Sequence, residues 1–321
     1  MTLGGTYTVF RKELADHFGS YRFTILFALI TMVSLITVYM AGVDLRDAFQ
    51  GSVRPRFVFL MLFTSAGTVF SLVQFVGFFG PLIGLILGFD AINRERVTGT
   101  LSRLVSQPIY RDSIINGKFL AGVTTIFVMF FSIVLLISGL GLVVLGVVPG
   151  VEEVFRVLFY VIISVFYISF WLGLAILFSI LFRGIATSAL AGLALWIFFS
   201  FFVPLGANVV ANAVSPVDKE KASLEDVVKN LRVQRAVSLS SPMTLYGDSA
   251  AVIVDPLRKS VKPLLVVGPK EKLSSERFKN PLPLLQSLLV VFPYITVLVA
   301  ITLICFGVSY TSFMLQEVRS L

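Results

Sequence analysis

"FLAGVTTIFVMFFSIVLLISGLGLVVLGVVPGV" runs from residue 119 to residue 151 without a single charged side chain. A helix that crosses a bilayer needs roughly 20 mostly apolar residues, so this stretch is long enough to span a membrane. A membrane β-barrel would instead show short segments of alternating polarity. The stretch therefore predicts a membrane-spanning α-helix.

Five further runs of the same kind lie on either side of it. They are Phe23–Val43, Phe57–Phe89, Val157–Phe182, Gly184–Val217 and Asn280–Glu317, the last with a charge only at its edge. Of the 321 residues, 57% are hydrophobic and 14% are charged, and the mean hydropathy is +0.93. These values lie outside the range of soluble domains, and we predict an all-α membrane protein with six transmembrane helices.

Two of the runs are too long for one straight crossing. Phe57–Phe89 and Gly184–Val217 would each reach about 50 Å as a helix, against a bilayer core of about 30 Å. We expect the first to be one kinked helix that extends beyond the bilayer, and the second to end in a short re-entrant piece around Ala207–Val214. The kinks are assigned to Pro81, Pro204 and Pro293.

The basic residues in the short loops predict the orientation. With the N-terminus inside, ten of them face the cytoplasm: Arg11, Lys12, Arg22, Arg94, Arg96, Arg103, Arg111, Lys118, Arg183 and Arg319. Four face outward: Arg46, Arg54, Arg56 and Arg156. Because such residues favour the inner side, we expect a multi-pass plasma-membrane protein with both termini cytoplasmic. The other twelve lie in the long stretch 215–279, so the net charge of +8 does not indicate nucleic acid as a partner.

An amphipathic helix is expected before the first span. Tyr7, Phe10, Leu14, Phe18 and Tyr21 recur at helical spacing, while Arg11, Lys12, Glu13 and Asp16 lie mostly on the other face. This pattern is typical of a helix that lies along the membrane surface. We expect it to lead directly into the first span.

Several classes of function are disfavoured. The chain has one cysteine and one histidine, Cys305 and His17, so we expect neither an internal disulfide nor a metal site. Gly117-Lys118 lacks the residues of a phosphate-binding loop; we therefore expect no ATPase site, and ATP would be bound by another polypeptide. The interiors of the spans carry no ionisable residue, which argues against a proton-coupled carrier and a charge-lined pore.

A polar segment interrupts the apolar runs: "GFDAINRERVTGTLSRLVSQPIYRDSIINGKFLAG", residues 88–122. We expect the second span to continue to Arg96 and to break at Gly99. Leu101 and Leu104 then lie on one face of a short helix that Thr98 or Thr100 caps and Pro108 ends. A helix with an exposed apolar face and charged flanks is suited to a groove on a soluble partner.

In this segment the chain resembles the permease subunits of type 2 ATP-binding-cassette (ABC) transporters, mostly exporters. "RERVTGTLSRLVSQPIYRDSIINGKFL" follows the family pattern nearly throughout, and Val97 is one departure, since many members have a second glutamate there. The residues that match the family pattern at the same spacing are Glu95, Gly99, Thr100, Leu101, Leu104, Ser106, Pro108, Arg111 and Lys118. The "FRKELADHF" start and the "FMLQEVRSL" end fit the same family, so the resemblance covers essentially the whole chain.

The resemblance implies the organisation of the chain and its partners. An elbow helix occupies residues 1–22, spans 1–5 occupy 23–214 with a coupling loop at 90–118, an extracytoplasmic insertion occupies 215–283, and span 6 with a short tail occupies 284–321. Two ATPase subunits with ATP and Mg, a second permease protomer (identical or a paralogue) and the bilayer are the implied partners. The coupling residues are Glu95, Arg96, Gly99, Thr100, Leu101, Arg103, Leu104, Pro108 and Arg111, and the elbow residues are Phe10, Arg11, Lys12, Glu13 and Leu14.

Two helices are predicted within the stretch 215–283. Ser223 can cap a helix over "SLEDVVKNLRVQRAV", and Ser241 with Pro242 can begin another that ends at Pro256. The basic remainder of the stretch would gate an exit, meet an extracellular partner or form a passive cap.

Two functions follow. The first is the permease subunit of an ATP-driven exporter, in which nucleotide closure of the ATPase is transmitted through the coupling helix. The alternative is a membrane anchor or scaffold of ABC type that transmits force to an extracellular partner without moving a solute. A wide cavity between protomers would favour the first, and a tightly packed dimer the second.

Overall fold

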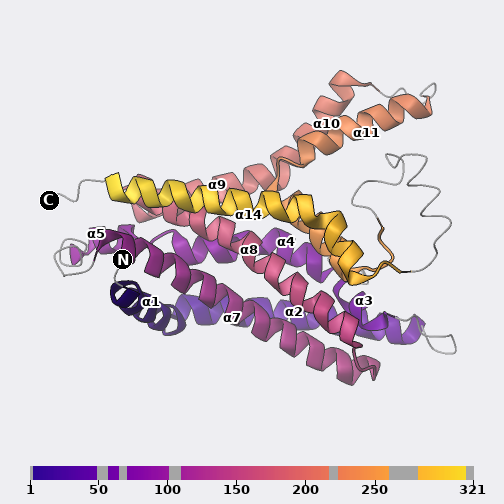
Figure 1. The fold of residues 1–321 in the computed structure, drawn as a ribbon, viewed down its shortest axis with the longest axis horizontal. Coiled ribbons are helices and arrows are strands. Elements are labelled where there is room, and N and C mark those ends of the chain that lie inside the picture. The colour runs from indigo at the N-terminus through magenta and orange to yellow at the C-terminus, as the bar shows by residue number, and fades with distance from the viewer. Residues whose placement is uncertain are drawn as a thin grey trace.

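The computed structural model describes residues 3–48, 57–64, 71–100, 110–216, 223–259 and 281–315. Within these ranges every regular element is a helix (Figure 1). The elements are α1 (Leu3–Phe18), α2 (Tyr21–Ala48), α3 (Val58–Thr64), α4 (Leu72–Gly88), α5 (Asn93–Val97), α7 (Arg111–Leu145), α8 (Val151–Leu181), α9 (Ile185–Ile197), the π-helical η1 (Phe198–Phe202), α10 (Val203–Val214), α11 (Leu224–Ser238), α12 (Pro242–Val254) and α14 (Leu284–Leu315).

Six helical segments are long and apolar enough to cross a membrane. They are Tyr21–Asp47, Leu72–Val97, Arg111–Leu145, Val151–Leu181, Ile185–Val214 and Leu284–Leu315. The predicted all-helical fold with six spans is therefore confirmed.

The two ends of the bundle carry different elements. Helix α1, helix α5 and the last turn of α14 lie at one end, which we call the proximal end (Figure 1). Helix α3, the first turn of α8 and the first turn of α14 lie at the other, which we call the distal end. The residues that precede the first span and those that end the last one therefore share an end of the bundle, as six crossings require.

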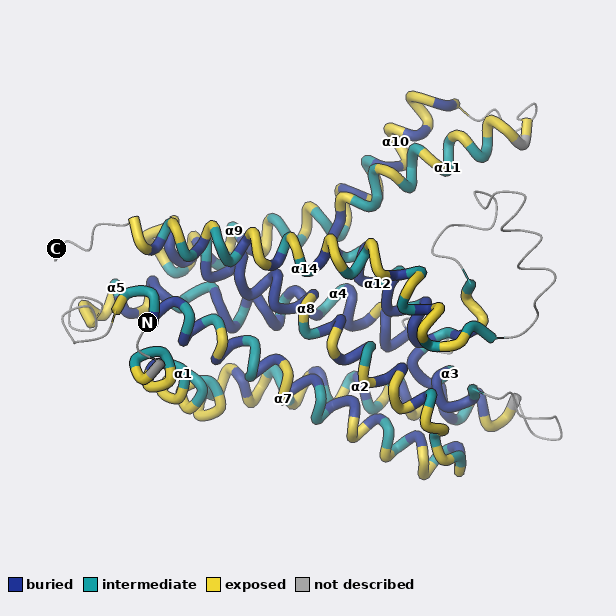
Figure 2. The backbone as a smooth tube through the Cα atoms, in the orientation of Figure 1, coloured by how far each residue is buried: buried dark blue, intermediate teal, exposed yellow. Residues whose placement is uncertain are grey.

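Helix α8 is the centre of the bundle and contacts α4, α7, α12 and α14. In its most apolar stretch 72% of the residues are buried, against 17% in α2 and 11% in Ile185–Val214 (Figure 2). Close approach of α4 to α8 depends on Gly84, where an added Cβ would lie 2.5 Å from the carbonyl oxygen of Ile168. Small residues allow helices to pack closely in membranes, so α4 and α8 form the core that positions the other helices.

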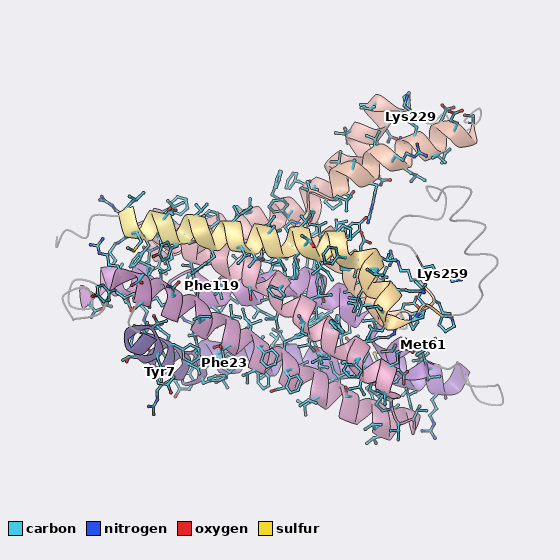
Figure 3. The ribbon with its side chains drawn as sticks, viewed as in Figure 1. Tyr7, Phe23, Met61, Phe119, Lys229 and Lys259 are labelled. Atoms are coloured by element: carbon cyan, nitrogen blue, oxygen red, sulfur yellow. The ribbon has the colours of Figure 1, made fainter. Side chains whose placement is uncertain are left out.

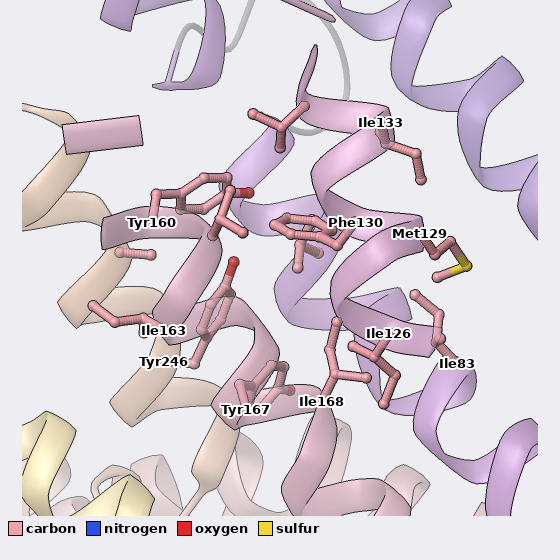
Figure 4. Packing of buried hydrophobic residues seen from close by; sticks show 14 of the residues in the cluster. Ile83, Ile126, Met129, Phe130, Ile133, Tyr160, Ile163, Tyr167, Ile168 and Tyr246 are labelled. Atoms are coloured by element: carbon pink, nitrogen blue, oxygen red, sulfur yellow. The ribbon is translucent and has the colours of Figure 1, made fainter. Parts of the chain in front are cut away.

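Helix α12 also belongs to this core. Tyr246, fully buried, stacks on Tyr167 of α8 with ring centroids 4.4 Å apart, and its hydroxyl lies 3.0 Å from Ser164 Oγ (Figure 4). The expected start at Ser241 and Pro242 is confirmed. Helix α12, which we expected within an extracytoplasmic insertion, packs against α4, α8 and α14, and most of its side chains are buried there.

The prediction of one kinked helix over Phe57–Phe89 was wrong. Helix α3 ends at Thr64, and α4 begins separately after Ser71. The Ser71 side chain accepts a hydrogen bond from the Gln74 backbone N–H, and the Gln74 side chain accepts one from the Ser71 N–H. This capping box starts a new helix within an apolar run. Pro81 lies inside α4.

The prediction of a re-entrant piece at Ala207–Val214 was also wrong. The chain stays helical from Ile185 to Val214, and the π-helical turn η1 directly precedes Pro204. The Val203 N–H reaches back to the carbonyl of Phe198, a wider turn that accommodates a proline, which lacks an N–H. The third assigned kink residue, Pro293, lies inside α14.

Helices α10 and α11 form a hairpin that projects away from the bundle (Figure 1). Gln234 Nε2 donates to Asn208 Oδ1 at 2.6 Å, and Asn230 Nδ2 donates to Asn212 Oδ1 at 3.0 Å. The predicted cap of α11 is confirmed, because Ser223 accepts a hydrogen bond from the Asp226 N–H. These amide pairs join the two helices side by side.

Candidate functional site: a charged junction at the proximal end

Helix α1 lies directly against α7. Gly117 makes this contact possible, since an added Cβ would lie 2.8 Å from the Val9 side chain and 3.1 Å from the Phe10 backbone nitrogen. Val9 is buried there. The contact places the charged side of α1 next to Lys118, one residue after Gly117. Helix α1 ends at Phe18, and α2 begins at Tyr21 after a short break, so α1 does not run straight into the first span.

Four charged side chains from three helices meet at this contact, and we call them the proximal junction: Lys12, Glu13, Glu95 and Lys118. Lys118 Nζ lies 2.8 Å from Glu13 Oε1 and 2.9 Å from Glu95 Oε1. Lys12 Nζ lies 3.0 Å from Glu13 Oε1 and 3.7 Å from Glu95 Oε1. The junction therefore links α1, α5 and α7 through charge pairs.

The junction is unevenly buried. The Lys118 and Glu95 side chains are 4% and 10% exposed, whereas that of Lys12 is 52% exposed. Glu95 Oε2 is buried and has no hydrogen-bond partner within the described ranges. A buried carboxylate oxygen without a donor is costly, so Glu95 has the capacity to accept one more hydrogen bond.

Electrostatics favour the charged forms of the junction residues on α1. Burial acts to raise the pKa of Glu13, but its pairs with Lys118 and Lys12 outweigh burial and hold that pKa below its ordinary value. Burial likewise acts to lower the pKa of Lys12, but Glu13, then Glu95 and Asp16, raise it overall. Burial lowers the pKa of the neighbouring His17 despite the nearby Glu13 carboxylate. At neutral pH Lys12 and Glu13 are therefore charged.

Helix α5 is also attached to the turn between α8 and α9. The backbone N–H groups of Ile92 and Asn93 both donate to Ser179 Oγ, at 2.9 and 3.0 Å. Asn93 Nδ2 donates to the carbonyl of Gly184 at 3.2 Å. Because α5 begins the predicted coupling loop, the start of that loop is fixed to α1, α7 and the α8–α9 turn together.

A pocket of about 780 Å³ adjoins the junction. Residues of α1, α2, α4, α5, α7 and α8 line it, including all four junction residues. At its edge Arg22 Nη1 lies 2.7 Å from Asp90 Oδ2, and the Arg22 guanidinium lies 5.6 Å from the centre of the Phe89 ring.

The structure brings some of the predicted coupling residues together. Glu95 is in the junction, and Arg96 donates to Asn93 Oδ1 at 3.4 Å. Gly99 has a φ of 70°, the left-handed conformation that breaks a helix, as expected. Thr100 Oγ1 donates to the Glu95 carbonyl at 3.3 Å. Arg111 is the first residue of α7, and Leu101, Arg103, Leu104 and Pro108 lie outside the described residues.

The predicted elbow residues divide between the two sides of α1. Glu13 contacts α7 through Lys118, Lys12 and Arg11 are exposed, and Phe10 and Leu14 are half-buried. Tyr7, on the apolar side, is 62% exposed (Figure 3). The apolar side is therefore free of the bundle in part, while one charged residue of the opposite side, Glu13, is buried against α7 rather than in water.

Sequence reasoning missed the role of two residues. No structural role was predicted for Lys118, although it is the centre of the junction. Glu95 was expected as a flanking charge, although it is buried. The pairing of Lys118 with Glu13 joins residues far apart in the sequence. The one available signal was a lysine directly before a long apolar run, where burial requires a partner.

Among the described residues, the junction offers ion pairs between helices. Within the described part of the chain there is no group of three or more His, Cys, Asp and Glu side chains that could hold a metal ion. Ion pairs between helices instead couple the position of one helix to that of the next.

Comparison with known proteins shows the family of this chain. The family model described as "ABC-2 family transporter protein" matches residues 7–318. This chain belongs to the ABC-2 transporter family. It is similar to "Probable ABC transporter permease protein NosY" of Pseudomonas aeruginosa, with 36% identity over 115 residues. That alignment covers 36% of this chain and 37% of the relative. The match of the family model confirms the resemblance, including its extent over essentially the whole chain.

Proposed function

We propose that this ABC-2 family protein is the permease subunit of an ATP-driven exporter whose ATPase is a separate polypeptide. The observation that carries the proposal is the Lys118 junction, which ties the start of the predicted coupling loop to α1 and α7. A movement of that loop displaces Glu95, and Lys118 transmits the displacement to α1 and α7. Two ATPase subunits that bind ATP and Mg, and a second permease protomer, complete the proposed assembly.

Rigid attachment at the junction is what makes this transmission efficient. Helix α5 is short and is held by Ser179 and Gly184 on one side and by Lys118 on the other. It therefore moves with α7, α8 and α1, which include the central helix of the bundle. Nucleotide-driven closure of the ATPase would then shift spans and not merely a surface loop.

The test of coupling uses the complex with the ATPase subunit. Leu101→Asp and Leu104→Asp place a charge on the proposed docking face and should abolish co-purification of the ATPase, since an interface charge without a partner costs about 2 kcal/mol or more. Val148→Asp is the matched control, because Val148 is 82% exposed in the turn between α7 and α8. Retention of the ATPase by both leucine variants, with unchanged ATP hydrolysis, would contradict the proposal.

The proposed orientation places both termini in the cytoplasm of the cell and the α10–α11 hairpin outside the plasma membrane. In a Cys305→Ser background, a cysteine at Ser223 or Ser275 should react with a membrane-impermeant thiol reagent on intact cells. A cysteine at Ser102 should react only after permeabilisation. Labelling at Ser102 from outside would reverse the orientation.

A second candidate function rests on the projecting α10–α11 hairpin (Figure 1). In this alternative the chain is an ABC-type scaffold that transmits ATPase-driven force to an extracellular partner. Reversal of exposed charges on α11, Lys229→Glu with Arg232→Glu, would then abolish function in cells while ATP hydrolysis and assembly stay unchanged. An exporter would retain its function in the same variant.

A further inference from the structure

The pocket beside the proximal junction has two chemically different parts. Apolar side chains of the spans line one part, among them Leu26 of α2, Ile86 of α4 and Leu172 of α8. Charged side chains of α1 and α5 line the other. A pocket that is apolar toward the spans and polar toward the end of the bundle matches the division of a phospholipid into chains and headgroup.

The charges that line the pocket balance. The basic residues are Lys12, Arg22, Arg94 and Lys118. The acidic residues are Glu13, Asp16, Asp90 and Glu95. The formal charges cancel, so the pocket favours a ligand that carries both signs of charge and no net charge.

Two polar groups of the pocket can form further hydrogen bonds with such a ligand. Glu95 is 8% exposed, and its Oε2 atom has no hydrogen-bond partner within the described ranges. Arg94 is exposed and has no ion pair in the described part of the chain. The first can accept a hydrogen bond from an ammonium group, and the second can donate to a phosphate.

We propose that this pocket holds the headgroup of an ethanolamine phospholipid, with its ammonium at Glu95 Oε2 and its phosphate at Arg94. The ammonium of ethanolamine has N–H donors, which the quaternary group of choline lacks. A glycerol headgroup carries one net negative charge, which the balanced charges of the pocket do not offset. This inference does not rest on the proposed function, because it concerns the lipid and not the ATPase.

The pocket also has an outlet toward the lipid. Tyr21 lines it and is 87% exposed, and Ile25 and Leu29 follow at one-turn intervals on α2 with 66% and 58% exposure. An acyl chain can follow this apolar row along α2 while the headgroup stays among the charges. The row connects the pocket to the region that the bilayer occupies.

The test measures which lipid the full-length protein retains. The protein is delipidated in detergent, offered equal amounts of ethanolamine, choline and glycerol phospholipids of the same acyl composition, and analysed by native mass spectrometry. Retention of the ethanolamine lipid should exceed that of the choline lipid about tenfold, the scale of one charge-assisted hydrogen bond. Equal retention of the three lipids would overturn the proposal.

Three variants locate the lipid. Arg94→Gln removes the phosphate contact without touching the junction and should reduce the preference to near unity, as should Glu95→Gln. Arg11→Gln, an exposed basic residue of α1 that does not line the pocket, should leave it unchanged. Because Glu95→Gln also alters the junction, Arg94→Gln is decisive: an unchanged preference in Arg94→Gln would overturn the assignment.

A further arm distinguishes the lipid from a soluble headgroup compound. Glycerophosphoethanolamine carries the same charges without acyl chains and should displace the lipid only at a large excess, since it lacks the apolar contacts along α2. Displacement at an equal concentration would show that a soluble compound suffices, and the assignment to a lipid would be wrong.

Discussion

Each end of the bundle has one buried basic residue that joins several helices, and the two are built differently. At the proximal end Lys118 pairs with two carboxylates, Glu13 and Glu95. At the distal end Arg156, which is fully buried, pairs with Glu152 and also donates to backbone carbonyls. We call Arg156 and its partners the distal clamp.

The distal clamp joins α8, α12 and α14 through both backbone and side-chain contacts. Arg156 Nη1 donates to the carbonyl of Ile253, near the end of α12, at 2.8 Å and to Ser287 Oγ of α14 at 3.3 Å. Its Nη2 donates to the carbonyl of Leu282 just before α14 and to Glu152 Oε1 at 2.9 Å. A guanidinium has five N–H donors in a rigid plane, so this end is held in one geometry.

The two ends differ in how easily their contacts can be rearranged when helices move. Backbone carbonyls cannot be repositioned without moving a helix, whereas charged side chains, such as those of the proximal junction, can keep an ion pair while their helices shift. Lys12 already contacts both Glu13 and Glu95 at longer range. The distal end is thus suited to holding helices together, and the proximal end to passing movement between them.

The largest expected effect is at the distal clamp. Arg156→Met leaves the carbonyls of Ile253 and Leu282 without donors inside the bundle. We expect a loss of about 3 to 5 kcal/mol in unfolding free energy, as for other broken buried pairs. The measurement is thermal unfolding of the purified protein in detergent.

Glu152→Gln is the control for this variant, because the Glu152 side chain is 34% exposed and its removal leaves the carbonyl contacts in place. If the two variants unfold at the same temperature, the carbonyl contacts contribute nothing measurable and the contrast between the ends is wrong.

The second largest effect is expected at the proximal junction, and its size should depend on whether the partners of Lys118 are present. Lys118→Met leaves Glu13 and Glu95 facing each other, but Lys12 and the adjoining pocket offer a cation and space for water. We expect a loss of about 1 to 3 kcal/mol, the scale of hydrogen bonds to charged groups. Part of this loss should be recovered in Lys118→Met with Glu95→Gln.

A double-mutant cycle over Lys118 and Glu95 measures this recovery through the thermal midpoints of the two single variants and the double variant. Residues in contact couple by about 0.5 to 3 kcal/mol. Additive shifts would mean that the ion pair carries no coupling and would weaken the mechanism that runs through it.

The sequence predicts the six spans because charge-free runs leave few alternatives in a membrane. It also predicts α11, since Ser223 and Asp226 provide a local cap. It does not predict the break before α4, because Ser71 lies within a continuous apolar run and only the capping box with Gln74 starts the helix there.

The junction and the position of α12 depend on contacts between distant parts of the chain. Nothing near Glu95 indicates that it is buried, since its partners come from α1 and α7. The apolar end of α12, Val252 to Val254, is compatible in sequence both with a helix in a surface cap and with a helix in the core. Its burial follows from Tyr246 and the space beside α8.

The third prediction concerns how the contact between α1 and α7 depends on pH. The pKa of Glu13 is lowered in the folded protein from a usual value of 4.5, so the unfolded chain binds more protons there. The stability from Glu13 is therefore fully present above about pH 4.5 and is lost as the pH falls through the lowered value. Acidification below pH 4.5 should release α1 from α7.

Hydrogen exchange of α1 amides, measured at a series of pH values, follows this release. Protection of α1 should decline in that acidic range in the wild type and already be low at neutral pH in Glu13→Gln. Amides of α12, beside the distal clamp, serve as the internal reference. An equal decline in both helices would indicate global unfolding and contradict a local release.

The smallest effect is expected at the edge of the proximal pocket, where Arg22 pairs with Asp90 at 2.7 Å. The Arg22 side chain is 60% exposed, so water screens the pair and replaces it when it is lost. Arg22→Gln should change the unfolding free energy by about 1 kcal/mol or less, and the thermal midpoint should stay close to that of the wild type. A loss as large as that of Lys118→Met would show that this pair belongs to the proximal junction, and that the ionic link between helices extends from α1 and α7 to α2.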